Sequence, residues 1–399
     1  MLVGSVSLRG LDFALSLPAI FYSVQMARSR QAMALTIGEK WIESKGRPSG
    51  FDMLRVVLSV SVILWHTLYV CYGETAEYWF WTGPLRPLVY VIIPAFFGLS
   101  GFLVASSLER NDLASFLTLR VIRIFPALAV EVLVSALLIG TFVTTLSLGQ
   151  YFSHPEFKAY FLNMIGDIHY FLPGVFDELP NNYVNIQLWT VPYELYCYLI
   201  LSALTLFGLH KRPLLMLLLL FVVIFITIIG QHITHTTPGM GRPDGFMLVF
   251  CFLFGVLLYF LKDKVIYSPW LLLASLVIFV FSIYKPATFN LAALPITYIT
   301  VCIGLTNRKI KLFSLTADYS YGLYLYGYPI QQLISYLLPT YRVWYINFAL
   351  TLIIAGALAY VSWHFVESKV LQKRKIILGI VRTVRLQIVR SLSGKLPSS

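Results

Sequence analysis

Residues 51–66 read Phe51-Asp-Met-Leu-Arg55-Val-Val-Leu-Ser-Val-Ser-Val-Ile-Leu-Trp-His66, an apolar run with a cation near its start and an imidazole at its end. At about 100° per residue, the steps from Arg55 to His66 return to nearly the same helix face, about 16 Å along the axis. Half of a membrane's hydrocarbon core is roughly 15 Å thick. With Arg55 at one membrane surface, His66 is therefore expected near the midplane. Ionisable side chains are unfavourable in lipid, so this pair indicates function.

The composition of the whole chain is that of a membrane protein. Of the 399 residues, 58% are hydrophobic and 12% are charged, and the mean hydropathy is +0.77. Soluble proteins carry about 25% charged residues, roughly twice this share. The four cysteines are scattered through apolar runs, with the spacing of neither a disulfide framework nor metal ligands. His232 and His235 lack a third ligand at helical spacing, so no metal site is predicted.

Ten apolar stretches are candidate membrane spans, which predicts an all-α, polytopic membrane protein. They cover residues 51–70, 87–108, 124–146, 188–209, 214–230, 246–261, 269–284, 290–306, 312–338 and 344–366. If the N-terminus is cytosolic, 25 of the 30 Lys and Arg residues fall on the inside, leaving outside Arg86, Lys158, Arg242, Lys285 and Arg342. This bias predicts that both termini are cytosolic. The net charge of +12 is therefore ascribed to topology and contact with membrane lipids, and no nucleic-acid partner is expected.

The sequence divides into three parts. Residues 1–47 are predicted to be a cytosolic or interfacial extension that contains the short apolar segment 11–24, unless translation starts at Met33. Residues 48–368 form the predicted transmembrane domain. Residues 369–399 are a basic tail, expected to lie as an amphipathic helix on the anionic cytosolic leaflet.

Polar residues also interrupt the later spans. Arg120 and Arg123 share a helix face at the expected cytosolic start of the third span. Paired guanidiniums there suit a phosphate, and the alternative is that they are only positive-inside anchors. Glu194 lies about two turns into the fourth span from the outside. A carboxylate at that place is either catalytic, acceptor-binding or an interhelical hydrogen-bond partner.

Two local ion pairs are expected at the edges of the spans. Asp52 lies three residues before Arg55 and is predicted to orient it. His364 and Glu367 have the same spacing near the cytosolic edge and are predicted to form a structural pair. The outside segment 147–187 combines aromatic and acidic residues. It is either a sugar-recognition loop or an ordinary interfacial loop.

Taken in order, these elements resemble the motifs of the bacterial acyltransferase type 3 family, the integral membrane O-acyltransferases of surface and exported glycans. The resemblance covers about residues 48–368. It rests on Arg-x10-His at Arg55/His66, Phe-Phe-x-x-Ser-Gly-Phe at 96–102, Arg-x-x-Arg at Arg120/Arg123, Trp-x4-Glu at Trp189/Glu194, and Ser-Tyr-x-x-Tyr-Leu at 320–325. One position departs from the pattern, because many members carry histidine where this chain has Gly327.

The resemblance implies transfer of an acyl group, usually acetyl from cytosolic acetyl-CoA, to a hydroxyl of an extracytoplasmic glycan by a multi-pass protein of the bacterial inner membrane. His66 is then expected to act as general base or as transient acyl carrier, with Glu194 as the second catalytic residue. The phosphates of the acyl-CoA are expected to be held by Arg55, Arg120 and Arg123. Four residues are expected to contact substrate, namely Ser100, Trp189, Tyr321 and Tyr324.

Three alternatives stand beside this interpretation. The same scaffold can serve a succinyl or longer-acyl transferase. A transporter of a glycan intermediate would also explain spans with buried charge, although no persuasive internal repeat is found. A non-enzymatic assembly partner of a polysaccharide synthase would leave the alignment of Arg55 with His66 unexplained. The sequence makes no prediction about the oligomeric state or the identity of the glycan.

Overall fold

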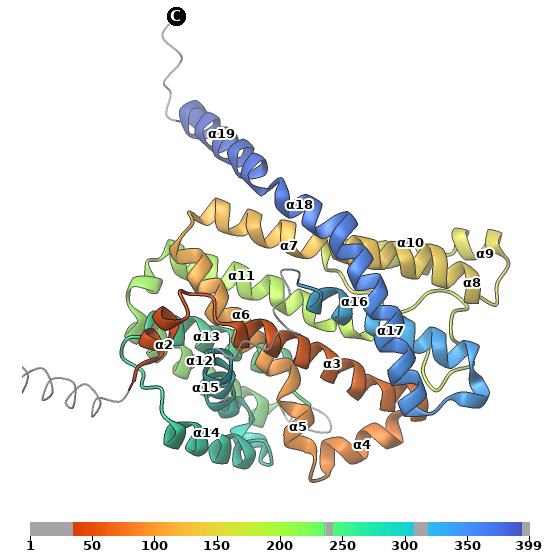
Figure 1. Cartoon of the computed structure of the whole chain (residues 1–399), viewed down its shortest axis with the longest axis horizontal. Helices are drawn as coiled ribbons and strands as arrows, with labels where there is room; N and C mark the ends of the chain where they lie inside the picture. Colours follow the sequence, from red (N-terminus) through yellow and green to blue (C-terminus); the bar gives the residue numbers. More distant parts are fainter. Residues whose placement is uncertain (1–34, 235, 237–241, 307–317, 393–399) are drawn as a thin grey trace, which may run out of the picture.

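The computed structural model describes residues 35–234, 236, 242–306 and 318–392 (Figure 1). Within these ranges the regular structure is helical, apart from an isolated antiparallel bridge between Thr36 and Ile266. The prediction of an all-α fold is therefore confirmed for the described part of the chain.

Among the described residues, five helical segments are long and apolar enough to cross a membrane. They are α3 (Ser49–Tyr72), α5 with α6 (Arg86–Tyr90, Ile92–Glu109), α7 continued by a π-helical turn and α8 (Leu113–Leu133, Val134–Ile139, Gly140–Val143), α12 (Pro213–Ile233), and α17 continued to α18 (Trp344–Ser362, Trp363–Glu367, Ser368–Gln372). Shorter helices occupy the other predicted stretches: α11 (Val191–Leu206), α13 (Gly245–Phe260), α14 (Pro269–Ser282), α15 (Ala293–Gly304) and α16 (Ser320–Leu337).

The helix that contains the third predicted span begins before residue 124. Helix α7 starts at Leu113, where the Asp112 side chain accepts a hydrogen bond from the Ser115 amide at 3.3 Å and caps the helix. Arg120 and Arg123 therefore lie about 10 and 15 Å into the helix along its axis. Both residues line a cavity inside the protein.

Helices α6 and α13 form the closest pair at the centre of the molecule. Gly98 and Gly101 on α6 face Gly255 on α13, and a Cβ added at Gly255 would overlap the Gly98 carbonyl oxygen. Close approach of two backbones in a membrane protein requires such small residues. The small residues of the second span therefore bring α13 directly against α6.

The segment between α8 and α11 folds into the protein. It contains α9 (Leu148–Ser153), α10 (Pro155–Tyr160) and two 3₁₀ turns, η3 (Phe161–Ile165) and η4 (Ile186–Thr190). Asn163 is fully buried, and its side-chain amide bonds both the amide and the carbonyl of His169 at 2.8 Å. These contacts hold the segment in a fixed shape and bring η4 beside α16, where the site lies.

The chain ends differ in how they contact the bundle. Helix α2 (Ile37–Glu43) packs on it through Trp41, whose ring centroid lies 5.4 Å from that of Phe102. The predictions for segment 11–24 and for Met33 concern residues outside the described ranges. Helix α19 (Arg374–Leu392) projects away from the bundle (Figure 1). Its Arg385 contacts Asp112 at 3.2 Å.

Candidate active site

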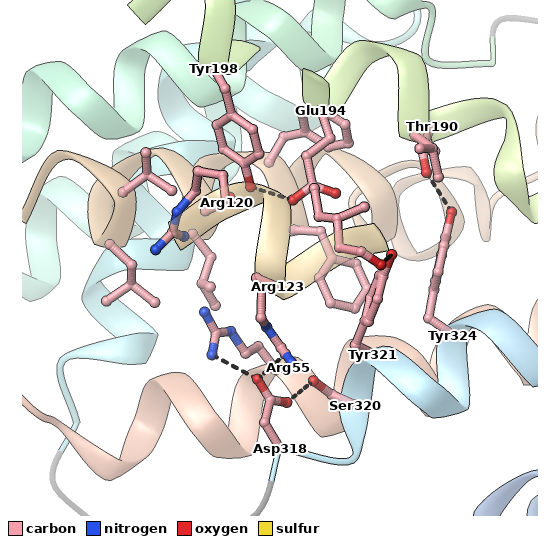
Figure 2. Close-up of a pocket in the computed structure, with 18 of the residues that line it drawn as sticks. Arg55, Arg120, Arg123, Thr190, Glu194, Tyr198, Asp318, Ser320, Tyr321 and Tyr324 are labelled. Atoms are coloured by element: carbon pink, nitrogen blue, oxygen red, sulfur yellow. Dashed lines mark hydrogen bonds and ion pairs between the residues drawn. The ribbon is translucent and has the colours of Figure 1, made fainter. Parts of the chain in front are cut away.

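One cavity lies between α3, α6, α7, α11 and α16, and its volume is about 150 Å³ (Figure 2). We call it the arginine cavity. Apolar residues of α6 form one wall, together with the Ser100 hydroxyl. The charged residues that line it are Arg55, Arg120, Arg123, Glu194 and Asp318.

Asp318 joins two of the three guanidiniums. One of its carboxylate oxygens lies 3.2 Å from Arg55 Nη1 and 2.5 Å from Arg123 Nη2. Arg123 also contacts Glu367 of the last helical segment at 3.1 Å, and Glu367 is only 3% exposed. Figure 2 shows Arg55 and Arg123 both pointing toward Asp318. The network ties α3, α7 and the start of α16 together around the cavity.

Arg120 is placed differently from the other two arginines. In the part of the chain that the structure describes, its guanidinium forms no ion pair, and it lies 6.0 Å from the ring centroids of Phe116 and Tyr198. Arg120 is partly buried, and a cation removed from water without a carboxylate partner is unfavourable unless an anion reaches it. Among the three arginines predicted to hold phosphate, Arg120 is therefore the one best placed to pair with an incoming anion.

Two expected local ion pairs are replaced by longer-range ones. Arg55 pairs with Asp318, whereas Asp52 is exposed at the start of α3. His364 Nε2 lies 3.1 Å from the Tyr319 hydroxyl, and Glu367 bonds Arg123. Both expectations were wrong because spacing along one helix identifies neighbours on that helix only. Partners on other helices make the stronger contacts here.

The remaining polar groups of the arginine cavity come from α11 and α16. Glu194 accepts a hydrogen bond from the Tyr198 hydroxyl at 2.5 Å. The Tyr321 hydroxyl donates to the Ile124 carbonyl at 3.3 Å, and the Arg123 guanidinium lies 5.4 Å from the Tyr321 ring centroid. Glu194 therefore lies among arginines and phenols.

The second cavity, of about 350 Å³, contains His66, and we call it the histidine cavity. Its wall is mostly aromatic, with an ion pair between the buried Glu77 and the partly exposed Arg242. The ring of His66 meets Tyr328 edge-on at 5.2 Å between centroids. No hydrogen bond links its ring nitrogens to another group in the described ranges. The imidazole is therefore available to a ligand in the cavity.

The two cavities share a wall made of Ile93 and Tyr324. The Tyr324 hydroxyl donates to the Gln187 carbonyl at 2.6 Å and lies 2.6 Å from the Thr190 hydroxyl (Figure 2). These two bonds fix the phenol between the arginines on one side and His66 on the other. The phenol therefore lines both cavities in a fixed position.

A proline in α16 explains why η4 docks at this wall. Pro329 has no amide hydrogen, so the Leu325 carbonyl four residues earlier has no helical donor. The Gln187 side chain donates to that carbonyl at 2.7 Å, and Gln187 is 1% exposed. The proline at the end of the sequence Tyr326-Gly-Tyr-Pro329 thus creates an acceptor that η4 satisfies.

Gly327, where many acyltransferase type 3 proteins carry histidine, packs against α3. A Cβ at this position would lie 2.8 Å from Ile63 Cγ1, closer than ordinary contact distance. On the next turn of α16, Gln331 donates to the Ile63 carbonyl at 2.6 Å. These contacts place α16 against the turn of α3 that precedes His66. The present packing leaves no room for a second histidine there.

The structure sorts the predicted site residues between the two cavities. The arginine cavity takes Arg55, Ser100, Arg120, Arg123, Glu194 and Tyr321. The histidine cavity takes His66 and Trp189, and Tyr324 lines both. The two residues predicted to be catalytic, His66 and Glu194, therefore line different cavities.

Four further residues were missed from the sequence. They are Glu77, Thr190, Arg242 and Asp318. Asp318 had a recognisable signal, because it is an acidic residue just before the Ser-Tyr motif in a chain with excess buried arginine. Within the described ranges no group of three His, Cys, Asp or Glu side chains is placed to hold a metal ion, and His235 lies outside those ranges.

Comparison with known proteins completes the description of the site. Residues 49–366 match the family model described as an acyltransferase domain. The chain is also 26% identical over 337 residues to a protein of Shigella phage Sf6 named O-acetyl transferase. The matched region covers 81% of this chain and 96% of the relative. No solved structure matches significantly.

Proposed function

The chain belongs to the acyltransferase family whose domain its residues 49–366 match, and from that premise we propose that it is a membrane O-acetyl transferase acting on a glycan. The resemblance to acyltransferase type 3 proteins is confirmed, and the chain is an enzyme. The transporter and assembly-partner alternatives therefore fall away. The phage relative, named an O-acetyl transferase, supports acetyl as the group transferred.

One observation carries the proposal, namely that an arginine-lined cavity and a histidine-lined cavity meet at Tyr324. Coenzyme A has an anionic nucleotide end and a long, nearly neutral pantetheine arm. Arg120 can bind its phosphates, while Arg55 and Arg123 supply further positive potential. From there the arm runs past Tyr324 and brings the thioester to His66.

His66 then acts on the acceptor hydroxyl. The neutral imidazole takes the hydroxyl proton while the hydroxyl oxygen bonds to the thioester carbonyl carbon. The carbon–sulfur bond breaks, the proton passes to the departing thiolate, and the products are an O-acetyl ester and free coenzyme A. The alternative is that His66 first accepts the acetyl group itself and then passes it to the hydroxyl.

The proposed topology follows from the charge bias of the loops. We place ten spans in the bacterial inner membrane, with both termini and the arginine cavity on the cytosolic side. Residues 48–368 then form the catalytic domain. Helix α19 would lie on the anionic leaflet through its arginines.

The test is mass spectrometry of the surface glycan from cells that lack the gene. The cells are complemented with wild type, His66→Ala or His232→Ala at matched membrane levels. His232 is exposed on α12, outside both cavities, and serves as the matched control. Wild type and His232→Ala should restore an acetyl mass shift, and His66→Ala should not.

Other outcomes separate the alternatives. A mass shift of succinyl or of a longer acyl chain would show that this group is transferred in place of acetyl. Restoration by His66→Ala would contradict the role of the histidine. An acetyl adduct on His66, found in purified wild type after rapid quenching with acetyl-CoA, would favour the acyl-carrier route over the base.

A further inference from the structure

Apart from His66, the lining of the histidine cavity has the composition of a carbohydrate-binding site. Indole or phenol rings come from four separate parts of the chain. They are Trp65 and Tyr69 of α3, Trp81 of α4 (Glu74–Thr82), Tyr170 and Tyr183 of the segment before η4, and Trp189 of η4. A pyranose ring has an apolar C–H face and a rim of hydroxyls. Aromatic rings match that face.

Glu77 supplies the polar group that such a site needs. It lies on α4, it is 7% exposed, and it lines the cavity that contains His66. One of its oxygens accepts from Trp81 Nε1 at 3.0 Å, and the other accepts from Arg242 Nη2 at 2.8 Å. An ionised carboxylate has about four lone-pair sites. The two bonds therefore fix the carboxylate and leave acceptor capacity for hydroxyl donors.

The charges in the cavity favour an uncharged ring. Glu77 and Arg242 balance each other, and among the residues that the structure describes no further acidic or basic side chain lines the cavity apart from His66. A sugar carboxylate would have to compete with Glu77 for the Arg242 guanidinium. It would also lie in a largely aromatic site, where an uncompensated charge is unfavourable. A neutral ring brings only hydroxyls, which Glu77 can accept.

We infer that the histidine cavity binds a neutral pyranose of the acceptor and that Glu77, held by Trp81 and Arg242, determines this specificity. The inference rests on the proposed function, since it places the sugar whose hydroxyl His66 deprotonates. Glu77 is thus a specificity-determining residue and takes no part in proton transfer.

The experiment uses the full-length protein in lipid nanodiscs. Saturation-transfer difference NMR measures binding of the methyl α-glycosides of glucose, galactose and mannose, each compared with the corresponding uronate. Titration calorimetry measures coenzyme A binding to the same samples. The variants are Glu77→Gln, the double variant E77M/R242M, which leaves no unpaired buried charge, and the control Glu74→Gln, an exposed residue of the same helix.

Wild type and Glu74→Gln should bind at least one neutral glycoside and none of the uronates. Glu77→Gln and E77M/R242M should bind it roughly 10- to 100-fold more weakly, as expected for a lost hydrogen bond to a charged group. Coenzyme A affinity should be unchanged in all four proteins, which also shows that the variants are folded.

The inference is overturned if Glu77→Gln and E77M/R242M bind the glycosides as wild type does. It is equally overturned if wild type binds the uronates preferentially or binds no glycoside. Failure of the proposed function looks different. In that case wild type binds no coenzyme A and restores no acetyl shift in cells, whatever the glycosides do.

Discussion

The arginine cavity and the histidine cavity share a wall at Ile93 and Tyr324, yet they differ in how they handle charge. The arginine cavity has three guanidiniums and two carboxylates on its lining, so positive charge is in excess. The histidine cavity balances one Glu–Arg pair inside a largely aromatic wall. This difference fits the division of tasks proposed above, with an anionic donor on one side and an uncharged acceptor on the other.

The largest expected effect comes from the histidine cavity. In purified protein, His66→Ala should lower the rate of acetyl transfer by roughly 10²- to 10⁴-fold, the usual contribution of a general base. Coenzyme A affinity should stay at the wild-type value, because the donor's phosphates bind in the other cavity. Transfer is followed with radiolabelled acetyl-CoA, and affinity by calorimetry. A parallel loss of both quantities would contradict the separation of the two cavities.

A change in the arginine cavity should have the opposite signature. Arg120→Met should weaken coenzyme A binding by roughly 10- to 100-fold, since hydrogen bonds to charged groups are lost. Dephospho-coenzyme A, which has fewer phosphate charges, should lose less affinity in the same titration. The control is Arg110→Met, an exposed arginine at the end of α6. If Arg110→Met has the same effect, the guanidinium of Arg120 has no special role.

The shared wall should give a smaller effect that involves both cavities. Tyr324→Phe removes the hydrogen bonds to Gln187 and Thr190 but keeps the ring. Transfer should fall by roughly 2- to 10-fold, in line with the loss of neutral hydrogen bonds. Because the phenyl ring of the variant is less restrained, hydrolysis of acetyl-CoA without acceptor should rise relative to transfer. An unchanged ratio of hydrolysis to transfer would show that the phenol does not separate water from the thioester.

The smallest effect is expected outside both cavities, at the contact between α7 and α19. The hydrogen bond from the Ser115 hydroxyl, helped by Arg385, lowers the pKa of Asp112 against the opposing effect of partial burial. This stabilisation is present above the usual aspartate pKa of about 3.9. It is lost as pH falls through the lower pKa of the folded state.

Asp112→Asn keeps the helix cap and removes only the charge. The melting temperature at pH 7 should fall by about 1–2 °C. The decline that wild type shows below about pH 4 should be shallower in the variant. The rate of transfer should not change. Thermal unfolding in detergent between pH 3 and 7 measures the melting temperature and its decline at low pH. A loss of transfer activity in the variant would mean that α19 affects the cavities.

Periodicity and composition predicted the positions of the helices well. They predicted the ion-pair partners of the charged residues poorly. A helix at each of the ten predicted stretches follows from runs of apolar residues, which any helix in a membrane needs. Arg120 and Arg123 resemble the boundary of a span when only the sequence is read, whereas the helix that holds them starts at Leu113. Their charges are accommodated by a cavity and by residues far along the chain, Asp318 and Glu367.

The sequence likewise predicted which residues belong to the candidate site, but not how they are arranged in space. The motifs identified His66, the three arginines and the residues predicted to contact substrate. The alignment of Arg55 with His66 on α3 also follows from the helix repeat alone. Glu77, Thr190 and Arg242 carried no motif. Their place at the cavities depends on how α4 packs against α3, η4 against α16, and α13 against α6.

The sequence by itself therefore determined the membrane-helix class, the family and the chemical types of the site residues, because these depend on local patterns. Only the tertiary structure decided that the site consists of two cavities, that His66 and Glu194 line different ones, and that Tyr324 stands between them. The physical reason is that charge pairing and cavity walls join residues more than a hundred positions apart, as in the contact of Arg123 with Asp318. Such contacts arise from helix packing, which side-chain volumes and glycine contacts across many helices set together.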